Sequence, residues 1–269
     1  MQSYVNGEFH SADKAKISIR DRGFRLGDGA FETILVHAGM PYQLALHMER
    51  LEKSLKYLKI KAGTKKFPKI IRTIIAKNKI CEGFVRVAVT RGQSGFGYSA
   101  KNTGNPSIIV ETEKSGTTKL KPAKLWLSSY MKPLPMPGKI IGNINSLLSR
   151  IEAEENNCLD SLLLDGEEKI CETSSANIFW FLGRKLFTPK SGIVEGTIRS
   201  AVIRLSPFPV VRGDFTLADL KKADAVFVTN VAWGILPVKE LQPLGLKWKN
   251  HKKTKILAQL LEADIHGMG

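Results

Sequence analysis

The sequence predicts an α/β protein with two domains, and three observations support this fold class. Runs rich in β-branched residues alternate with runs whose apolar residues have helical spacing. The chain has 269 residues, which is enough for two modest domains. A polar stretch near the middle of the chain has few groups to bury. We therefore expect one domain over residues 1–115, a linker over 116–122 and a second domain over 123–269.

Three strands and two helices are expected in the first domain. The run from Glu32 to His37 is rich in β-branched residues, and the run from Phe84 to Thr90 alternates as a strand does. From Leu46 to Leu58 the leucines recur at helical spacing, and isoleucines repeat this pattern between Phe67 and Ala76. The expected strands cover residues 32–37, 84–90 and 107–112, and the expected helices cover 46–58 and 67–76.

The second domain is expected to combine short strands with four helices. After a first strand, Pro133, Pro135 and Pro137 form a stiff loop that leads to Lys139. The expected strands cover residues 124–128, 161–164, 177–181, 185–187 and 225–229, and the expected helices cover 145–155, 197–205, 216–222 and 254–263.

The bulk composition is that of a folded protein from a reducing compartment. The chain is 43% hydrophobic and 25% charged, which argues against disorder. It contains no apolar run long enough for a transmembrane helix, and its start does not resemble a secretory signal. The three cysteines, Cys81, Cys158 and Cys171, follow no disulfide or metal-binding spacing. We therefore expect a cytoplasmic protein without a metal site and without a membrane partner.

The net charge of +16 allows three interpretations. Phosphate contacts to nucleic acid are one, attraction of an anionic cofactor and substrate is another, and a lysine-rich solvated surface is the third. Basic residues are spread along the chain, and no zinc-finger or aromatic–basic RNA motif accompanies them. We favour the solvated surface, with substrate attraction second, and we expect no nucleic-acid partner.

An amine, a carboxylate and a helix start follow one another in the second half of the chain. Lys139 lies in a loop made rigid by prolines and bounded by Gly138, which can hold a reactive amine at one point. Glu172 falls between two strand-like runs, where a carboxylate can pair with a pyridine nitrogen. The residues 196–199 open a helical run whose free N–H groups suit a phosphate. Together they are the parts that bind pyridoxal phosphate, although each alone also fits a surface lysine, an exposed glutamate or an ordinary helix cap.

The order of these residues resembles the fold-type IV pyridoxal-phosphate enzymes, the class IV aminotransferase family. This family includes branched-chain aminotransferases, D-amino-acid aminotransferases and 4-amino-4-deoxychorismate lyases. The resemblance covers almost the whole chain, from Val5 to Val238. The motifs that carry it are Asp21-Arg22-Gly23, Gly27-Asp28-Gly29-Ala30-Phe31-Glu32-Thr33, His47-Met48-Glu49-Arg50-Leu51, Lys139-x-x-Gly142-Asn143, Glu172-x-x-x-x-Asn177-Ile178-Phe179, Leu186-x-Thr188-Pro189, Gly196-x-x-Arg199, Ala223-Asp224 and Pro237-Val238.

The resemblance implies a fold and a set of residue roles. The fold is that of the D-amino-acid aminotransferases, with two α/β domains, the cofactor between them, and assembly as a homodimer. Lys139 would form the imine with the cofactor and later move a proton. Glu172 would pair with the pyridine nitrogen, and Arg50 would reach the phosphate with its forked donors. The backbone amides of Thr197 and Ile198 would complete the phosphate site.

Three positions depart from the family pattern. Ile144 follows the asparagine at a place where the aminotransferases commonly have a tyrosine that touches the cofactor's phenolic oxygen. At the helix start the threonine comes first, as Thr197, rather than second. Asn230 stands near the place of a further phosphate-binding threonine, and we include it among the cofactor-binding residues.

The cofactor leaves two reactions open. The stretches 90–99 and 175–180 resemble the lyases, whereas 31–33 and 142–143 are closer to the aminotransferases. We expect a 4-amino-4-deoxychorismate lyase, which forms p-aminobenzoate and pyruvate in folate biosynthesis. A branched-chain or D-amino-acid aminotransferase is the alternative. A cofactor-less scaffold or a basic binding protein is the third reading, and the intact amine and carboxylate argue against it.

The expected substrate is a small anionic amino compound. Phe31, Arg91 and Tyr98 are the candidate residues for contacting it. Phe96 stands where the lyases often have an arginine that meets a substrate carboxylate, and Arg91 is a candidate replacement. A structural role at the end of a strand is an equal possibility for Arg91. Large aromatic residues such as Phe31 and Tyr98 are also common in protein cores.

Overall fold

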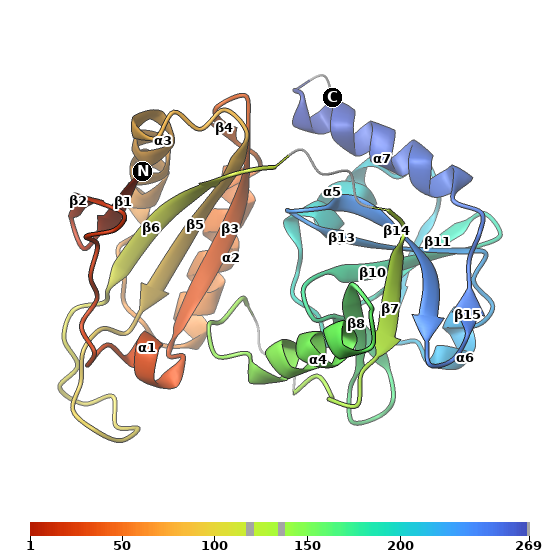
Figure 1. Ribbon diagram of the computed structural model, residues 1–269, viewed down its shortest axis with the longest axis horizontal. Helices are drawn as coiled ribbons and strands as arrows, with labels where there is room; N and C mark the ends of the chain where they lie inside the picture. The colour runs from red at the N-terminus through yellow and green to blue at the C-terminus, as the bar shows by residue number, and fades with distance from the viewer. Residues whose placement is uncertain (117–120, 134–137, 268–269) are drawn as a thin grey trace. The chain divides into compact units, whose positions relative to one another are not determined.

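The computed structural model describes residues 1–116, 121–133 and 138–267 (Figure 1). The chain forms two compact units, one of Met1–Thr117 with Pro137–Asn143 and the other of Thr118–Met136 with Ile144–Gly269. The segment 137–143, which contains Lys139, therefore belongs to the first unit, whereas the sequence analysis assigned it to the second domain. Much of the expected linker, residues 117–120, and two of the three loop prolines, Pro135 and Pro137, lie outside the described residues.

The first unit is built on an antiparallel sheet of six strands. Their order across the sheet is β2-β1-β6-β5-β3-β4. The longest pairing joins β3 (Gly29–His37) to β5 (Gly83–Thr90), and every second residue of β3 from Ala30 to Val36 is buried. This alternation is the pattern of a sheet with one face against a core. The remaining strands are β1 (Gln2–Val5), β2 (Glu8–Ser11), β4 (Met40–Pro41) and β6 (Ile108–Lys114).

Two helices cover this sheet, α2 (Leu44–Tyr57) and α3 (Phe67–Lys77), as Figure 1 shows for α2 behind β3. Their apolar stripes, which include Leu51 and Ile71, are fully buried against the sheet. A five-residue helix, α1 (Arg22–Leu26), and a 3-10 turn, Thr64–Lys66, complete the unit. The polar side of α2 that faces β3 carries the residues discussed below.

The second unit contains a mixed sheet of nine strands. Eight of them lie in the order β12-β11-β10-β13-β14-β7-β8-β9, and β15 pairs with β14. The pairs β11·β12, β7·β14 and β7·β8 are parallel and the others are antiparallel. The strands are β7 (Ala123–Leu127), β8 (Asp160–Leu164), β9 (Ile170–Thr173), β10 (Asn177–Leu182), β11 (Lys185–Pro189), β12 (Val210–Gly213), β13 (Ala225–Asn230), β14 (Gly234–Gln242) and β15 (Leu246–Lys247).

The central strands of this sheet are buried on both faces. Five consecutive residues of β10, from Asn177 to Phe181, are buried, which explains their continuous apolar character. On one face Trp180 packs in a core cluster, and on the other Phe179 stacks on Phe227 with ring centroids 5.1 Å apart. The helices of the unit are α4 (Ile144–Glu155), α5 (Thr197–Leu205), α6 (Leu217–Leu220) and α7 (Lys252–Ile265). Contacts of α5 with β13 and of α7 with β14 place these two helices on the sheet.

All the expected strands and helices are present, and several further strands were not expected. The α/β fold class is confirmed. The unexpected strands β1, β2, β4, β9, β12 and β15 have only two to four residues, too few to show a periodic pattern. The longer strand β14 was not expected either. Among the described residues, no helix is long and apolar enough to cross a membrane. In the same part of the chain, no group of three His, Cys, Asp or Glu side chains could hold a metal ion.

Candidate functional site

Lys139 is placed by the free edge of β3 at the start of that strand. The Lys139 carbonyl accepts a hydrogen bond from the Phe31 N–H at 3.0 Å, and the Ile141 N–H donates to Gly29 at 2.9 Å. An isolated antiparallel bridge joins Ile140 to Ala30. The segment is thus joined to the sheet by an isolated bridge and backbone hydrogen bonds, which fix the backbone of the lysine.

Helix α2 holds the same segment through Ser54. The Lys139 N–H donates to the Ser54 hydroxyl at 3.0 Å, and this hydroxyl donates in turn to the Arg50 carbonyl at 2.8 Å. Gly138 has a φ of +118° and lies against Ser54, so that a Cβ there would come within 2.8 Å of the serine Cα. Glycine is therefore required by both the backbone conformation and the close approach.

The Lys139 ammonium lies over an aromatic ring. Its Nζ is 4.6 Å from the ring centroid of Phe31, and the guanidinium of Arg86 is 4.3 Å from the same centroid. Phe31 was expected to contact the substrate, and the structure brings it next to the lysine expected to carry the chemistry. The face of an aromatic ring attracts a cation, so the Phe31 ring helps to hold the Lys139 side chain in place.

Arg50 forms a buried network with Glu32 and His47 inside the first unit. Its Nε and one terminal nitrogen donate to the two Glu32 oxygens at 2.7 and 2.6 Å, and His47 Nδ1 lies 2.7 Å from Glu32. Burial alone would raise the pKa of Glu32, but the hydrogen bonds from Arg50 and His47 outweigh it and lower the pKa to about 2. Burial lowers the pKa of His47, despite the opposing effect of Glu32. The expected phosphate ligand is thus a fixed side chain paired to an ionised carboxylate.

Glu172 lies on β9 in the second unit and is 5% exposed. Its Oε2 accepts from the Asn177 side-chain amide at 3.0 Å and from the Val194 N–H at 2.9 Å. Its Oε1 accepts from the ammonium of Lys132 at 2.6 Å. A carboxylate held at both oxygens by donors keeps one orientation. Glu172 was predicted from its motif, whereas no motif in the sequence marks Lys132.

The turn after Glu172 is organised by a buried aspartate. Asp160, which is fully buried, accepts hydrogen bonds from the hydroxyls of Thr173 and Ser175 at 2.8 Å, and from Ser174. These contacts explain why three hydroxyl residues follow the glutamate. They lock the turn that joins β9 to β10 and so fix Glu172 relative to Asn177.

Helix α5 begins without a side-chain cap, at Thr197. Its capping residue is Gly196, and a Cβ there would collide with the Asn177 side chain. The Thr197 hydroxyl is buried and has no hydrogen-bond partner among the described residues. Uncapped N–H groups at Thr197 and Ile198 beside an unsatisfied hydroxyl suit an oxyanion ligand. The residues thus fit a phosphate group.

Thr229 and Asn230 are neighbours at the end of β13, and they differ in whether the side chain has a hydrogen-bond partner. The Asn230 side-chain oxygen accepts from the N–H groups of Ala232 and Trp233 at 3.0 and 2.8 Å, so this side chain closes a turn. The hydroxyl of Thr229 is buried and has no partner in the described part of the chain. Thr229 pairs in register with Asn177, the residue that holds Glu172. Asn230 was predicted to bind the cofactor and Thr229 was not, although the Thr229 hydroxyl is the one without a partner among the described residues.

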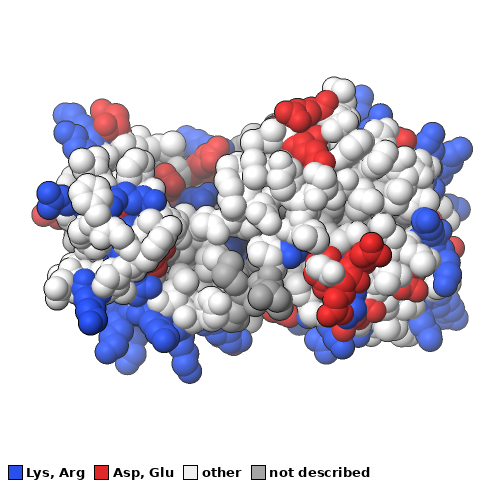
Figure 2. Space-filling model, turned by 90° about the horizontal axis from the view of Figure 1, so that it is seen from below, with Lys and Arg blue, Asp and Glu red and all other residues white. Residues whose placement is uncertain are grey.

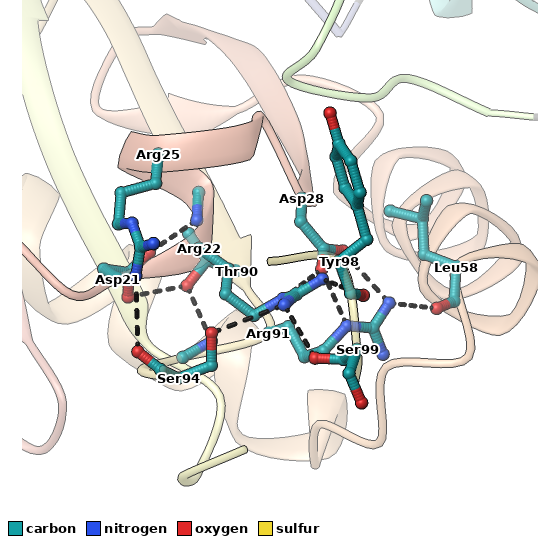
Figure 3. A network of polar contacts seen from close by, with 12 residues as sticks. Asp21, Arg22, Arg25, Asp28, Leu58, Thr90, Arg91, Ser94, Tyr98 and Ser99 are labelled. Atoms are coloured by element: carbon teal, nitrogen blue, oxygen red, sulfur yellow. Dashed lines mark hydrogen bonds and ion pairs between the residues drawn. The ribbon is translucent and has the colours of Figure 1, made fainter. Parts of the chain in front are cut away.

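Arg91, an expected substrate contact, is engaged in a structural network of the first unit (Figure 3). Its guanidinium donates to both oxygens of Asp28, at 2.8 and 3.0 Å, and to the carbonyls of Leu58 and Lys59 at 2.6 and 3.2 Å. Arg22 donates to the same aspartate at 2.7 Å. Burial opposes ionisation of Asp28, but hydrogen bonds from both arginines lower its pKa. These contacts favour the structural role that the sequence left open for Arg91.

The same network holds the loop that carries Tyr98, the third expected substrate contact. Arg22 donates to the carbonyls of Tyr98 and Ser99 at 3.2 and 3.0 Å, as Figure 3 shows. The Arg25 guanidinium donates to the Gly95 carbonyl at 3.0 Å and lies 4.7 Å from the ring centroid of Phe96. The backbone of the loop is therefore anchored, while the side chains of Phe96 and Tyr98 are 98% and 87% exposed.

Positive side chains occur in several separate groups on the face shown in Figure 2. The run 53–79 of the chain contains ten positive side chains, and all are exposed: Lys53, Lys56, Lys59, Lys61, Lys65, Lys66, Lys69, Arg72, Lys77 and Lys79. This distribution agrees with the solvated-surface interpretation of the net charge. It places none of these ten cations in the interior of the first unit.

Comparison with known proteins identifies the family. The family model for class IV amino-transferases matches residues 29–241, a range that includes Lys139, Glu172 and Thr197. The chain belongs to this family. It is a pyridoxal-phosphate-dependent enzyme, as the sequence analysis expected.

Members of the class IV family similar to this chain differ in their names. A putative branched-chain-amino-acid aminotransferase of Methanocaldococcus jannaschii is 30% identical, over 97% of this chain and 94% of that protein. An aminodeoxychorismate lyase of Bacillus subtilis is 26% identical, over 98% and 95%. The crystal structure of 4-amino-4-deoxychorismate lyase from Pseudomonas aeruginosa superposes with a TM-score of 0.86 at 27% identity, covering 97% of this chain and 98% of that one.

Proposed function

We propose that this class IV enzyme is a 4-amino-4-deoxychorismate lyase, which releases p-aminobenzoate and pyruvate for folate synthesis. The observation that carries its cofactor chemistry is the buried, hydrogen-bonded carboxylate of Glu172. A lysine held by backbone contacts, Lys139, accompanies it in the first unit. Both groups are of the kind that pyridoxal phosphate requires.

Several residues described above would hold the cofactor. The amides of Thr197 and Ile198 and the hydroxyls of Thr197 and Thr229 would bind the phosphate, because these hydroxyls are buried and unsatisfied among the described residues. Arg50 would add its forked cation. Glu172 would pair with the ring nitrogen. The bound cofactor supplies an electron sink for a carbanion beside its imine.

In the lyase reaction Lys139 would act as the base. Its Nζ would accept the proton from the substrate carbon that bears the amino group. The bond between the ring and the enolpyruvyl oxygen then breaks, the ring becomes aromatic, and the departing group becomes pyruvate. The Phe31 ring, whose centroid is 4.6 Å from Nζ, would help to hold the lysine side chain in position for this step.

Two features support the lyase over the aminotransferase. Ile144 is 60% exposed at the first position of α4, so it offers no hydroxyl where the family's aminotransferases commonly place a tyrosine. The stretches 90–99 and 175–180 resemble the corresponding stretches of the lyases. The aminotransferase remains the second candidate, because a relative with that name is 30% identical.

A paired assay separates the two reactions. The purified enzyme, loaded with pyridoxal phosphate, is mixed with aminodeoxychorismate, and p-aminobenzoate is measured by its fluorescence. In parallel it is mixed with L- and D-amino acids, and conversion of the cofactor to its amine form is followed by absorbance. We expect product in the first assay and no conversion in the second. Conversion by an amino acid without p-aminobenzoate formation would reject the lyase.

The cofactor link is tested with a variant. Lys139→Ala should abolish the visible absorption band of the loaded enzyme and the mass increase that borohydride reduction fixes on the protein. Lys169→Ala is the matched control, because Lys169 pairs with Glu167 on the surface. A band that survives in Lys139→Ala would reject the assignment of this lysine.

We further propose that the enzyme works in the cytoplasm as a homodimer on a small anionic amino substrate. The family resemblance supports the assembly, and the spread of positive charge supports attraction of an anion. Light scattering coupled to size exclusion measures the assembly directly. A monomer at micromolar concentration with full activity would contradict it.

A further inference from the structure

Lys132 and Glu172 form a buried ion pair inside the second unit. The ammonium lies 2.6 Å from Glu172 Oε1, and the two side chains are 12% and 6% exposed. Other lysine ion pairs, such as Lys53 with Glu49 and Lys169 with Glu167, are largely exposed. Exposed pairs contribute little, whereas a buried carboxylate needs a counter-charge to be tolerated. The Lys132 pair is therefore of a different kind.

Backbone contacts fix the position of Lys132. Its N–H donates to the Leu164 carbonyl at the end of β8 at 2.7 Å. Just before it, the Ser129 N–H and the Ser128 hydroxyl bind the carboxylate of Glu152 on α4 at 3.0 and 2.8 Å. The ammonium is thus carried by an ordered segment tied to a strand and a helix, and not by a free surface side chain.

The Lys132 ammonium contacts Oε1 of Glu172, which is the oxygen that the cofactor's ring nitrogen would bind. Oε2 of Glu172 already accepts two hydrogen bonds, from Asn177 and Val194. A protonated pyridine nitrogen is itself a cation that seeks Oε1. Two cations at one oxygen repel each other, so the ammonium and the ring nitrogen compete for the same carboxylate.

We propose that Lys132 is the built-in counter-ion of Glu172 in the unloaded enzyme, and that it lowers the affinity for the cofactor by competing with the ring nitrogen. The inference rests on the proposed role of Glu172 as the partner of that nitrogen. Lys132 is a positioning residue in this scheme. It keeps the carboxylate ionised and oriented until the cofactor arrives.

The test measures binding to the cofactor-free protein. The probe is pyridoxamine 5′-phosphate, which has the ring nitrogen and phosphate but no aldehyde, so that the covalent link to Lys139 does not enter. We expect Lys132→Met to bind the probe about tenfold more tightly than the parent and to have a lower melting temperature without it. Lys132→Arg, which keeps the charge, should match the parent in both.

Two further variants and one further ligand make the outcome decisive. Lys132→Gln removes the charge but keeps a hydrogen-bond donor, so tighter binding is still expected if Lys132→Met does not fold. An analogue with carbon in place of the ring nitrogen should gain nothing from either substitution. Lys169→Met serves as a surface control and should leave binding unchanged.

The proposed cofactor site and the proposed competition by Lys132 can be rejected separately. If the parent does not bind pyridoxamine 5′-phosphate, the proposed cofactor site is rejected. If the parent binds it and the neutral variants bind equally or more weakly, only the competition by Lys132 is rejected. Equal gains for the analogue without the ring nitrogen would also reject it.

Discussion

The backbone of Lys139 is tethered to helix α2 by Ser54, whose hydroxyl accepts the lysine N–H at 3.0 Å. The same hydroxyl donates to the carbonyl of Arg50 one turn earlier. A single buried oxygen therefore links the segment of the expected imine-forming lysine to the helix of the expected phosphate ligand. Arg50 and Ser54 are four residues apart, so they share one face of α2.

Ser54→Ala is expected to loosen this tether. The loss of a buried hydrogen bond should reduce the free energy of unfolding by about 1 kcal/mol and slow the formation of the visible absorption band after addition of pyridoxal phosphate. Thr73→Ala is the control, because Thr73 makes the same contact to the carbonyl four residues earlier on α3, at 2.8 Å. Equal band formation in both variants would show that Ser54 does not position the lysine.

Gly138→Ala is expected to displace Lys139. The new methyl group would collide with Ser54, and the φ of +118° is unfavourable for alanine. Gly7 has the same φ of +118° with no neighbour within 4 Å, so Gly7→Ala carries the backbone cost alone. Denaturation should show both variants weakened, and only Gly138→Ala should lose cofactor incorporation. Normal incorporation in that variant would contradict the packing argument.

Glu32 is expected to make the protein sensitive to acid. Its folded pKa is lowered from 4.5 to about 2, so the stabilisation is complete above the unfolded value and is lost as the pH falls from about 4.5 towards 2. The shift corresponds to roughly 3 kcal/mol. Burial lowers the pKa of His47, so this side chain destabilises the folded protein as the pH falls below about 6.5. The pKa values of Asp28 and Glu152 are lowered as well, so urea unfolding between about pH 5 and pH 3 is compared between the parent and a variant at Glu32.

The matching variant is Glu32→Gln. It should be less stable than the parent at neutral pH, because Arg50 loses its buried counter-charge. Its stability should fall less steeply than that of the parent over the same acid range. A parallel decline in the two proteins would mean that Glu32 titrates normally.

Thr197→Val is expected to weaken phosphate binding without weakening the fold. The valine removes a buried hydroxyl that has no partner among the described residues, so the unloaded protein should be as stable as the parent or more so. Affinity for pyridoxamine 5′-phosphate should drop by about tenfold, the value of one charge-assisted hydrogen bond. Thr254→Val on α7 removes a similarly buried, unsatisfied hydroxyl and should leave affinity unchanged. Unchanged affinity in Thr197→Val would remove this residue from the phosphate site.

One thiol of the three is expected to react rapidly with Ellman's reagent. Cys81 is exposed, whereas burial raises the pKa of Cys171 to about 12 and also raises that of Cys158. A thiol with a raised pKa forms little of the nucleophilic thiolate at neutral pH. Cys81→Ser should abolish the rapid phase, and full denaturation should reveal the other two thiols. A second rapid equivalent in the native protein would contradict the burial of Cys158 or of Cys171.

The regular elements were predictable because their signals are local. The run 32–37 is β-branched, and the helix 197–205 starts after a glycine and repeats apolar residues at helical spacing. Strand β14 escaped notice because Pro237 lies inside it, and a proline normally argues against a strand. Its partner at that position is Phe227 in a fully formed antiparallel ladder.

The candidate site was predictable only where a residue belongs to a motif. Lys139 and Glu172 stand in motifs, but Ser54, Asp160 and Lys132 act through contacts with distant parts of the chain. No local pattern marks a serine as the partner of a lysine 85 residues away. The same reason explains the unit boundary, because the hydrogen bonds along the edge of β3 outweigh closeness in sequence.

The assignment of residues 137–143 to the first unit also constrains the order of events during synthesis. The N-terminal sheet emerges from the ribosome well before this segment, so the start of β3 waits with one edge uncovered until the later residues are translated. Cutting the chain once near residue 117 would therefore not release a complete N-terminal unit, because the segment that bridges β3 at Ala30 would remain on the other piece.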